Sequence, residues 1–563
     1  MYEYKIKLIY WIFVLVFISN SVVSKAQDLA NLKKTESSVH GSFSATAVGY
    51  SVDGIDPRKD PFSYILSGNL TVDAKGVVLP ISFVYSNRNK EFSQPFNQFG
   101  LTPHYKWIKM YLGYNNVNFS KYVLGGHTVF GAGVELNPGI LRVGVMYGRL
   151  QKMTNKAIKV NDPFGSNLGK FDRKMLSAKL GVGTKETFID FIVMKAEDDS
   201  TSIEQTDKQD YNLPAANLVG GVNTRIRFSE SVHFEGEGAY SIYTDNQRLE
   251  EVDLTDIKIN PPIPVNASTD YFLAIRTSLI YRSPKGTKFG LNYRRIDPGY
   301  KSMGVYFINN DLENFTVSTA FKMLKQKMQI KGSLGLERNN LNTNRDVTTH
   351  KVIGSGNLTY NPTRFFGINM NYSNYSINQT PGRIQIADSI KIYQTNATLM
   401  IMPHAQFSSK NKKINHFITL PFTRVGLVDR NPYSNKLTEF TMTNLMLSYN
   451  LNFAPSGLSL IASALYNQVD MATGTSYNKT GTIGIMKTML DKKLNMALNL
   501  NITQSENTKE TFDVITPVFT TRYRIDKHHS FRFKMYAIFN KNQTDSLKSF
   551  NEQSEDFSYV YTF

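Results

Sequence analysis

Residues 494–503 read LNMALNLNIT, and their side chains alternate between two chemical types. One face is apolar and consists of Leu494, Met496, Leu498, Leu500 and Ile502. The other face is small or polar and consists of Asn495, Ala497, Asn499, Asn501 and Thr503. A period of two with an uncharged polar second face predicts a β-strand with one apolar side. A soluble sandwich can contain one such strand, but roughly twenty or more consecutive hairpins with no helix between them favour a closed barrel.

An earlier hairpin shows charged residues on the polar face. Its first strand has an apolar face of Leu218, Gly220, Val222, Ile226 and Phe228, and an opposite face of Asn223, Arg225 and Arg227. After a turn at 229–231, the returning strand places Val232, Phe234, Tyr240 and Ile242 on the apolar side and His233, Glu235 and Glu237 with the arginines. Cross-strand pairing then predicts an interior ion pair between Arg225 and Glu235.

The composition agrees with a membrane barrel better than with a soluble protein. Mean hydropathy is only -0.30, yet the chain has 36 Phe and 31 Tyr. After the N-terminal region, no window of about 20 apolar residues is long enough for a spanning helix. A barrel explains both features, because each strand presents only every second residue to lipid, and its other face, toward the lumen, is expected to stay polar.

The connections between expected strands alternate in length. Short turns are expected at 73–76, 137–139, 183–186, 283–286, 324–327, 361–364, 454–457 and 490–493. Longer polar loops are expected at 152–170, 197–212, 244–268 and 378–388. Outer-membrane barrels have short periplasmic turns and long external loops, which places all the short turns on the periplasmic side.

Two segments break the up-and-down parity of the strands, residues 88–126 and 297–312. The raw count is near 26 strands, and removing one from each segment leaves about 24, within a range of 22–26. A barrel of about 22 strands already needs an obstruction to avoid leaking. We therefore consider the two segments candidates for inward-folded constrictions, and the alternative of long external loops with a small hairpin is equally open.

Both ends of the chain carry export signals. Lys5, Lys7, the apolar run 8–18 and the small residues before Gln27 predict a signal peptide at 1–26, cleaved near Ala26. A short periplasmic segment at 27–42 and a barrel at 43–563 follow. The chain has no Cys, so neither disulfides nor a lipoprotein anchor is predicted. The last strand ends on an alternating aromatic face that resembles a barrel-insertion signal, made of Phe557, Tyr559, Tyr561 and Phe563. The expected location is the outer membrane of a Gram-negative-type bacterium.

Two further stretches resemble a family of large outer-membrane β-barrels that is common in Bacteroidota. The first consists of 94–100 (QPFNQFG), 105–107 (YKW), 125–127 (GGH) and 131–139 (GAGVELNPG). The second is 293–304 (YRRIDPGYKSMG). Most members of that family have no assigned role, so the resemblance implies the fold and the location but no substrate. A TonB-dependent receptor is not expected, because too few residues precede the first strand to form a plug domain.

Catalytic chemistry has little support in the sequence. No G-x-S-x-G elbow occurs, and the nine His residues are scattered. His127 and His233 are expected to be structural rather than catalytic. The acidic residues of 197–210 fit no calcium-loop spacing and are expected to be solvated. We predict no enzyme activity, cofactor or metal, and a barrel-embedded hydrolase is only a distant alternative.

The charge of the interior face is the main functional signal. The basic candidates for the lumen lining are Arg225, Arg227, Arg276, Lys288, Arg294, Lys327, Lys331, Arg522, Arg524, Arg532 and Lys534. The acidic candidates are Glu235, Glu237 and Glu337. Rings of Arg and Lys favour anions, so we expect a channel or porin-like passage that prefers anionic solutes. The alternative use of these cations is to pair with lipid phosphates at the rims or to hold the interior segments.

The expected partners follow from the location. They are outer-membrane lipid and lipopolysaccharide, the barrel insertion machinery during biogenesis, and other outer-membrane or periplasmic subunits. Nucleic acid is not expected, although the net charge is +18. The alternative function is a non-conducting barrel subunit of a secretion or surface-assembly complex.

Overall fold

A computed structural model describes residues 37–74, 77–87, 98–154, 169–203, 213–252, 261–383 and 387–563. The predicted signal peptide at 1–26 lies outside the described residues, as does most of the segment predicted at 27–42. The first strand begins at Ser38, earlier than the expected barrel start at residue 43.

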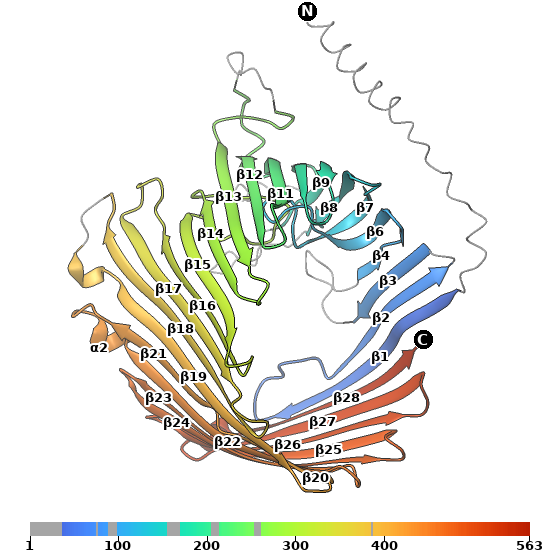
Figure 1. Cartoon of the computed structure of the whole chain (residues 1–563), viewed down its shortest axis with the longest axis vertical. Coiled ribbons are helices and arrows are strands. Elements are labelled where there is room, and N and C mark those ends of the chain that lie inside the picture. Colours follow the sequence, from blue (N-terminus) through green and yellow to red (C-terminus); the bar gives the residue numbers. More distant parts are fainter. Residues whose placement is uncertain are drawn as a thin grey trace, which may run out of the picture.

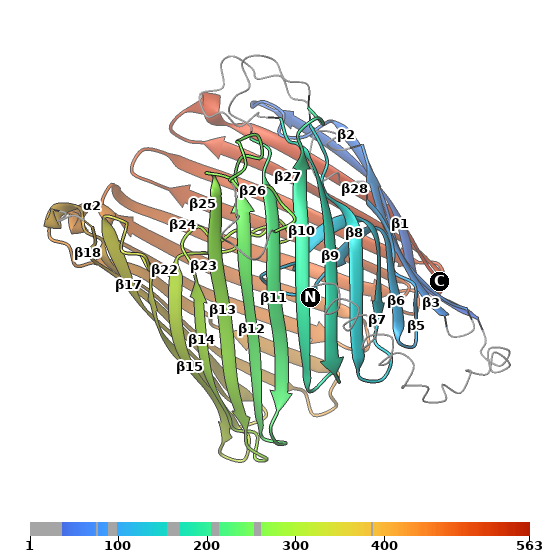
Figure 2. The same ribbon diagram turned by 90° about the horizontal axis from the view of Figure 1, so that it is seen from above.

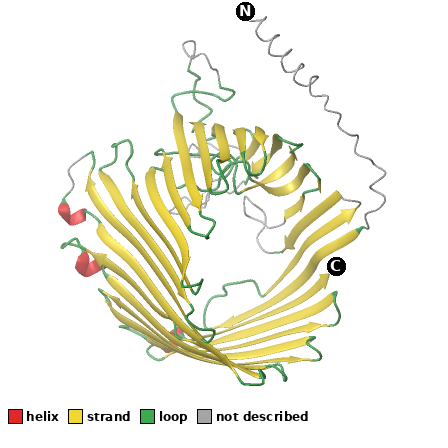
Figure 3. Ribbon diagram, in the orientation of Figure 1, coloured by secondary structure: helices red, strands yellow, loops and turns green. Residues whose placement is uncertain are grey.

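The structure is almost entirely antiparallel β-strand (Figures 1 and 3). The first half of the barrel contains β1(Ser38–Asp53), β2(Phe62–Ala74), β3(Val77–Ser86), β4(Gln98–Leu101), β5(His104–Tyr105), β6(Ile108–Val117), β7(His127–Leu136), β8(Leu141–Gln151), β9(Asp172–Gly183), β10(Phe188–Asp199), β11(Ala216–Arg227), β12(Val232–Thr244), β13(Thr269–Arg282) and β14(Lys288–Ile296). The second half contains β15(Leu312–Met323), β16(Met328–Arg338), β17(Val347–Tyr360), β18(Phe366–Pro381), β19(Tyr393–Ser408), β20(Ile414–Thr419), β21(Phe422–Asp429), β22(Phe440–Phe453), β23(Leu458–Met471), β24(Gly474–Met489), β25(Leu494–Glu506), β26(Thr511–Arg524), β27(His529–Asn542) and β28(Phe550–Thr562). The described helices are α2(Asn435–Thr438), η2(Asp388–Ile390) and η3(Ser546–Lys548).

These segments form one closed antiparallel barrel of 26 strands. The number of segments is larger because β4 and β5 share one position beside β3, and β20 and β21 share one position beside β19. Pro103 and Pro421 lie at the two interruptions, where proline cannot donate a ladder hydrogen bond. The number of strands lies within the predicted range and above the central expectation of 24.

The barrel closes where β1 pairs with β28 along most of their length (Figure 1). The register places Phe557 opposite Ala47 and Tyr559 opposite Ala45. On the other side of β28, Phe531 contacts the rings of Phe557 and Tyr559 at centroid distances of 5.8 and 5.3 Å. The last strand thus presents an outward aromatic face that packs against β27 and meets small side chains on β1.

The outer face is a band of exposed apolar side chains. Leu498 and Ile502 of β25 are 49% and 53% exposed, and they share that face with large apolar residues on the neighbouring strands. The predicted alternation of 494–503 is confirmed, as is the hairpin of β11 and β12. Exposed apolar residues around a closed sheet require lipid as their solvent. Figure 2 shows the strands tilted across the barrel.

The two ends of the barrel differ in their connections. Short turns join β7 to β8, β9 to β10, β13 to β14 and the later pairs at one end, which we call the short-turn end. Two of these turns contain three consecutive residues with positive φ, at 324–326 and 490–492. The opposite end carries the longer connections and is called the long-loop end. The predicted alternation of loop lengths is therefore present, although residues 75 and 76 of one expected turn lie outside the description.

No helix in the described part of the chain has the length and apolar character needed to cross a membrane.

The lipid-facing assignment predicts the effect of charge substitution near the middle of β25. Leu500→Arg should lower the free energy of unfolding by about 2–4 kcal/mol, because an arginine near the bilayer midplane is poorly solvated. Asn499→Arg is the control, because Asn499 is the neighbouring residue on the inner face. It should change the free energy of unfolding by less than about 1 kcal/mol. Reversible unfolding of the barrel in lipid vesicles would measure both, and equal losses would contradict the assignment.

Candidate functional site: two inner segments and the charged interior face

Two connections from the long-loop end fold onto the inner face of the barrel. The first inner segment comprises residues 118–126, between β6 and β7, and the second comprises residues 297–311, between β14 and β15. Both lie against the wall formed by β6 to β15 (Figure 1). The buried apolar cluster of the structure includes residues of this wall and of both segments. They fall within the two segments that break strand parity in the sequence.

The two inner segments bind each other through backbone and side-chain contacts. Leu124 and Gly304 form a parallel β-bridge, and the Gly125 N–H donates to the Gly304 carbonyl at 3.1 Å. The Tyr300 hydroxyl donates to the Tyr122 carbonyl at 2.9 Å. The Val123 carbonyl, next along the first segment, accepts a hydrogen bond from the Ser302 hydroxyl at 2.7 Å. Several backbone groups of the first segment are therefore satisfied by the second, so neither segment is held alone.

Glycine is required where the two inner segments cross, at the bridge between Leu124 and Gly304. A Cβ on Gly304 would overlap the backbone oxygen of Val123 and the sulfur of Met194. A Cβ on Gly221 of β11 would approach the Val123 side chain to 2.6 Å. The segments approach each other and the wall so closely that only glycine fits at these two positions.

Polar side chains of the wall anchor both segments. In the first segment, the Ser120 hydroxyl donates to Glu237 of β12 at 2.7 Å. In the second, the Met303 N–H donates to the buried Asn217 of β11 at 2.9 Å. The Lys301 ammonium lies 2.9 Å from an Asp245 carboxylate oxygen. These contacts fix both segments against consecutive strands of the wall.

Under the segments the inner face is apolar. Met146, Met175, Met194 and Val219 point inward from neighbouring strands and are almost fully buried. The sequence interpretation expected a polar face toward the lumen on every strand, and this expectation is wrong for the wall that carries the segments. Apolar side chains are needed there because the segments exclude water from it.

Burial also affects the phenols of the two inner segments. It raises the pKa of Tyr300 and of Tyr122 above their ordinary values. Both side chains therefore stay protonated at neutral pH. Tyr300 can then remain a hydrogen-bond donor to the first segment.

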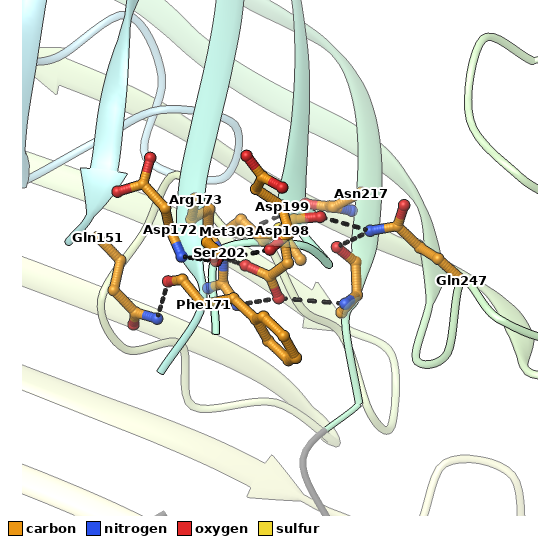
Figure 4. A network of polar contacts seen from close by, with 11 residues as sticks. Gln151, Phe171, Asp172, Arg173, Asp198, Asp199, Ser202, Asn217, Gln247 and Met303 are labelled. Carbon is orange, nitrogen blue, oxygen red and sulfur yellow. Dashed lines mark hydrogen bonds and ion pairs between the residues drawn. The ribbon is translucent and has the colours of Figure 1, made fainter. Parts of the chain in front are cut away.

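A polar network closes the long-loop end of the same wall (Figure 4). Arg173 of β9 donates two hydrogen bonds to Asp198 of β10, at 2.7 and 3.0 Å. The same carboxylate accepts from the Ala215 N–H at 3.1 Å, and Gln247 donates to the Ala215 carbonyl at 2.7 Å. Asp198 is buried and Arg173 is partly buried, and the hydrogen bonds compensate the carboxylate for its lost hydration.

The interior holds acidic residues that sequence reasoning missed. Asp190 accepts from Arg142 at 2.6 Å, and Glu135 lies 3.1 Å from Lys179. Asp198, which was expected to be solvated with the other acids of 197–210, is buried and pairs with Arg173. Only Glu235, Glu237 and Glu337 were expected as interior acids. The alternation of β10 could have revealed the inward direction of Asp190, since Ile189 and Phe191 beside it face lipid.

Several predicted lining residues take part in ion pairs. Arg225 lies 2.9 Å from Glu235, directly across the ladder, so the predicted pair is confirmed. Arg227 pairs with Glu186. Glu337 lies 3.1 Å from Lys351 and 3.5 Å from Arg294. These charges are largely neutralised within the barrel.

Two further candidates have different surroundings. Lys327 lies in the turn between β15 and β16 and donates to the Pro362 carbonyl at 2.8 Å. Its predicted position on an inner strand face is therefore wrong, because the β15 strand ends before it. Arg276 lies opposite both Glu237 and Arg294 in the ladder, on the inner face beside the first inner segment.

The remaining cations gather at the short-turn end. Lys288 and Lys331 face the interior on either side of Ala320. Both line a pocket of about 520 Å³ whose other lining residues include serines, threonines and asparagines. On the other side of the barrel, the inner faces of β26 and β27 carry Arg522, Arg524, Arg532 and Lys534. No ion pair joins any of these cations to an acid among the described residues.

Uncharged ladders cover much of the inner face between these cations. The Ser333 and Ser355 hydroxyls are 2.7 Å apart, and Thr480 and Thr503 are 2.9 Å apart. Asparagine pairs continue the pattern on other strands: Asn357 with Asn371 and Asn444 with Asn467. This part of the wall can be wetted without exposing apolar groups.

The histidines and the acidic loop have structural contacts. His127 stacks on Tyr306 of the second inner segment at a centroid distance of 3.8 Å. His233 lies opposite Arg227 near the short-turn end. Asp199 accepts from the Thr201 hydroxyl at 2.7 Å, and residues 204–210 of the acidic loop lie outside the description. No group of three metal-ligating side chains occurs within the described residues.

Comparison with known proteins finds distant likenesses of shape. No family model matches the chain, and no curated protein matches it. The P pilus usher PapC translocation pore is 11% identical, with a TM-score of 0.40 over 93% of this chain and 99% of that one. Pseudomonas aeruginosa OccK10 is 10% identical, with a TM-score of 0.28 over 93% and 99%. The E. coli ferric-catecholate receptor Fiu is 10% identical, with a TM-score of 0.33 over 93% and 81%.

The close approach of the two inner segments can be tested by adding a single methyl group at Gly304. Gly304→Ala should weaken the attachment of both segments by about 1–3 kcal/mol, because a backbone oxygen cannot move away from the new Cβ. Amide hydrogen exchange of 118–126 and 297–311 should become faster in the folded barrel. Gly220→Ala is the control, since a Cβ there has open space. Unchanged exchange in Gly304→Ala would contradict the described crossing.

Proposed function

We propose that this protein is an outer-membrane passage for solutes, with a preference for anions. A closed barrel with a lipid-facing apolar band has a membrane as its natural environment, and its short-turn end corresponds to the periplasmic side. The two inner segments pack on one wall, and the wall from β16 to β28 carries hydroxyl and amide ladders. A 26-strand barrel is wide enough to leave an aqueous path beside such segments.

The observation that carries the anion preference is the group of unpaired cations at the short-turn end. Lys288, Lys331, Arg522 and Arg532 face the interior, and none has an ion-pair partner among the described residues. Cations that line an aqueous passage lower the electrostatic barrier for anions. The acids of the interior, in contrast, are mostly held in pairs and contribute little opposing field.

The ends of the chain and the inner segments support the remaining parts of the proposal. The aromatic face of β28 suits recognition by barrel insertion machinery, and the N-terminal apolar run suits export through a cleaved signal peptide. Residues of the family resemblance, among them Gly125, Tyr300 and Gly304, lie at the crossing of the inner segments. We therefore propose membership in that Bacteroidota barrel family, with the crossing as a shared structural element.

The selectivity proposal can be tested in planar bilayers with a salt gradient. The combined substitution Lys288→Gln and Lys331→Gln should lower the anion-to-cation permeability ratio by roughly twofold or more, because two unpaired lumen charges are lost. Lys479→Gln with Lys487→Gln removes the same charge from the outer face of β24 and should leave the ratio unchanged. Equal effects of the two pairs, or a cation-selective parent, would refute the anion preference.

A second experiment separates a passage from a non-conducting subunit of a secretion or assembly complex. Replacing residues 299–309 by a short glycine linker should increase single-channel conductance, because the second inner segment then no longer narrows the lumen. Mild detergent extraction from native membranes gives the complementary result. A barrel that never conducts in either form, and that always purifies with other subunits, would favour the alternative.

A further inference from the structure

The inner faces of β26 and β27 contain an arrangement of like charges that needs explanation. Arg522 lies directly opposite Arg532 in the ladder, and Arg524 follows on the same face of β26. Lys534 is two residues beyond Arg532. Like charges directly opposite each other destabilise a β-ladder. The nearest acid in the register is Asp556, opposite Lys534, and no ion pair joins it to any of the arginines.

The arginine pair lines a pocket whose walls carry both polar and apolar side chains. A pocket of about 360 Å³ is lined by three cations, by Asn495, Thr520 and Ser558, by the Asp556 carboxylate beside Lys534, and by apolar side chains that include Met486 and Phe533. The cations are Arg522, Arg532 and Lys534. Asn495 lies opposite Arg522, and Ser558 lies opposite Arg532. Cations in the middle and neutral hydrogen-bonding groups on both sides form a suitable shell for an oxyanion.

The hydrogen bonding of Arg522 also points to an absent ligand. Its Nε is enclosed and has no hydrogen-bond partner among the described residues. A buried guanidinium N–H without an acceptor is costly, and native proteins normally satisfy such groups. An anion between the arginines would accept this hydrogen bond and relieve the repulsion at the same time.

We infer that the Arg522–Arg532 pair is a binding site for a tetrahedral oxyanion, such as the phosphate group of a solute in the lumen. This inference deepens the proposed function by naming the chemical class of its anion, and it rests on the inner face being wet. Arg522 and Arg532 supply planar donors, Lys534 supplies a third cation, and Asn495 and Ser558 complete the polar shell. The site lies near the short-turn end, where a solute enters or leaves the periplasmic side.

The site can be tested by calorimetric titration of the full barrel in neutral, lipid-free detergent with inorganic phosphate at constant ionic strength. The parent should bind phosphate. Arg522→Gln with Arg532→Gln should weaken binding roughly tenfold or more, because two charge-assisted donors are lost. Lys288→Gln with Lys331→Gln removes the same charge from the distant cluster and should leave phosphate affinity within about twofold. Equal weakening by both double substitutions would mean that phosphate responds only to the overall positive charge of the lumen, and this result would refute the proposed site.

A charge-reversal variant tests whether a loss of phosphate binding could result from misfolding. Arg522→Glu should form an ion pair with Arg532 inside the barrel, so it should fold at least as well as the parent and lose phosphate binding. Acetate titration distinguishes a tetrahedral oxyanion from any carboxylate, and equal affinity for both would refute the stated class. Anionic phospholipid added to the micelles should not compete, and competition would assign the site to a lipid headgroup instead.

The outcomes for the site and for the passage are separable. Phosphate binding without anion-selective conductance would leave the site standing and refute the proposed passage. Anion-selective conductance in a parent that does not bind phosphate would refute the site and leave the passage standing.

Discussion

The structure depends on one constraint, which is that no backbone N–H or carbonyl can remain unpaired in lipid. The chain meets it by pairing each strand with two neighbours and by joining β28 to β1. Closure then fixes the side chains, because alternate residues must face lipid and the residues between them must face the interior. The outward aromatic face of β28, opposite Ala45 and Ala47, places the closing seam in the same apolar band.

Closure at 26 strands creates a second requirement, because a barrel of this width is not filled by its own side chains. Part of the interior must therefore be filled by other segments of the chain. The wall from β6 to β15 has apolar residues on both faces, as Met146 points inward and Tyr147 outward. Such a wall needs a covering layer on its inner side, and the two inner segments provide it. Their mutual hydrogen bonds through Gly125, Tyr300 and Gly304 satisfy backbone groups that would otherwise be buried without partners.

Local alternation in the sequence was sufficient to predict the fold class, β25, the β11–β12 hairpin and the Arg225–Glu235 pair. It was also sufficient to single out the two segments that break parity, but not to show that they contact each other, because that contact joins residues about 180 positions apart. The pairs of Glu135, Asp190 and Asp198 were missed for a related reason. Their partners are set by the register between strands, and one residue of slip reverses every side chain. Lys327 was assigned to the inner face although it also ends the turn predicted at 324–327, and the structure places it in that turn.

The distribution of paired and unpaired charge distinguishes the two sides of the interior. In the wall from β6 to β15 an isolated buried charge would be costly, and Arg142 and Arg173 each hold a buried carboxylate there. Lys288, Lys331, Arg522 and Arg532 at the short-turn end have no such partner among the described residues and would be costly too unless solvent or solute reached them. The structure retains Arg522 opposite Arg532, a repulsive arrangement that neutral residues would avoid. These unpaired cations are the feature on which the proposed passage for anions and the proposed oxyanion site both depend.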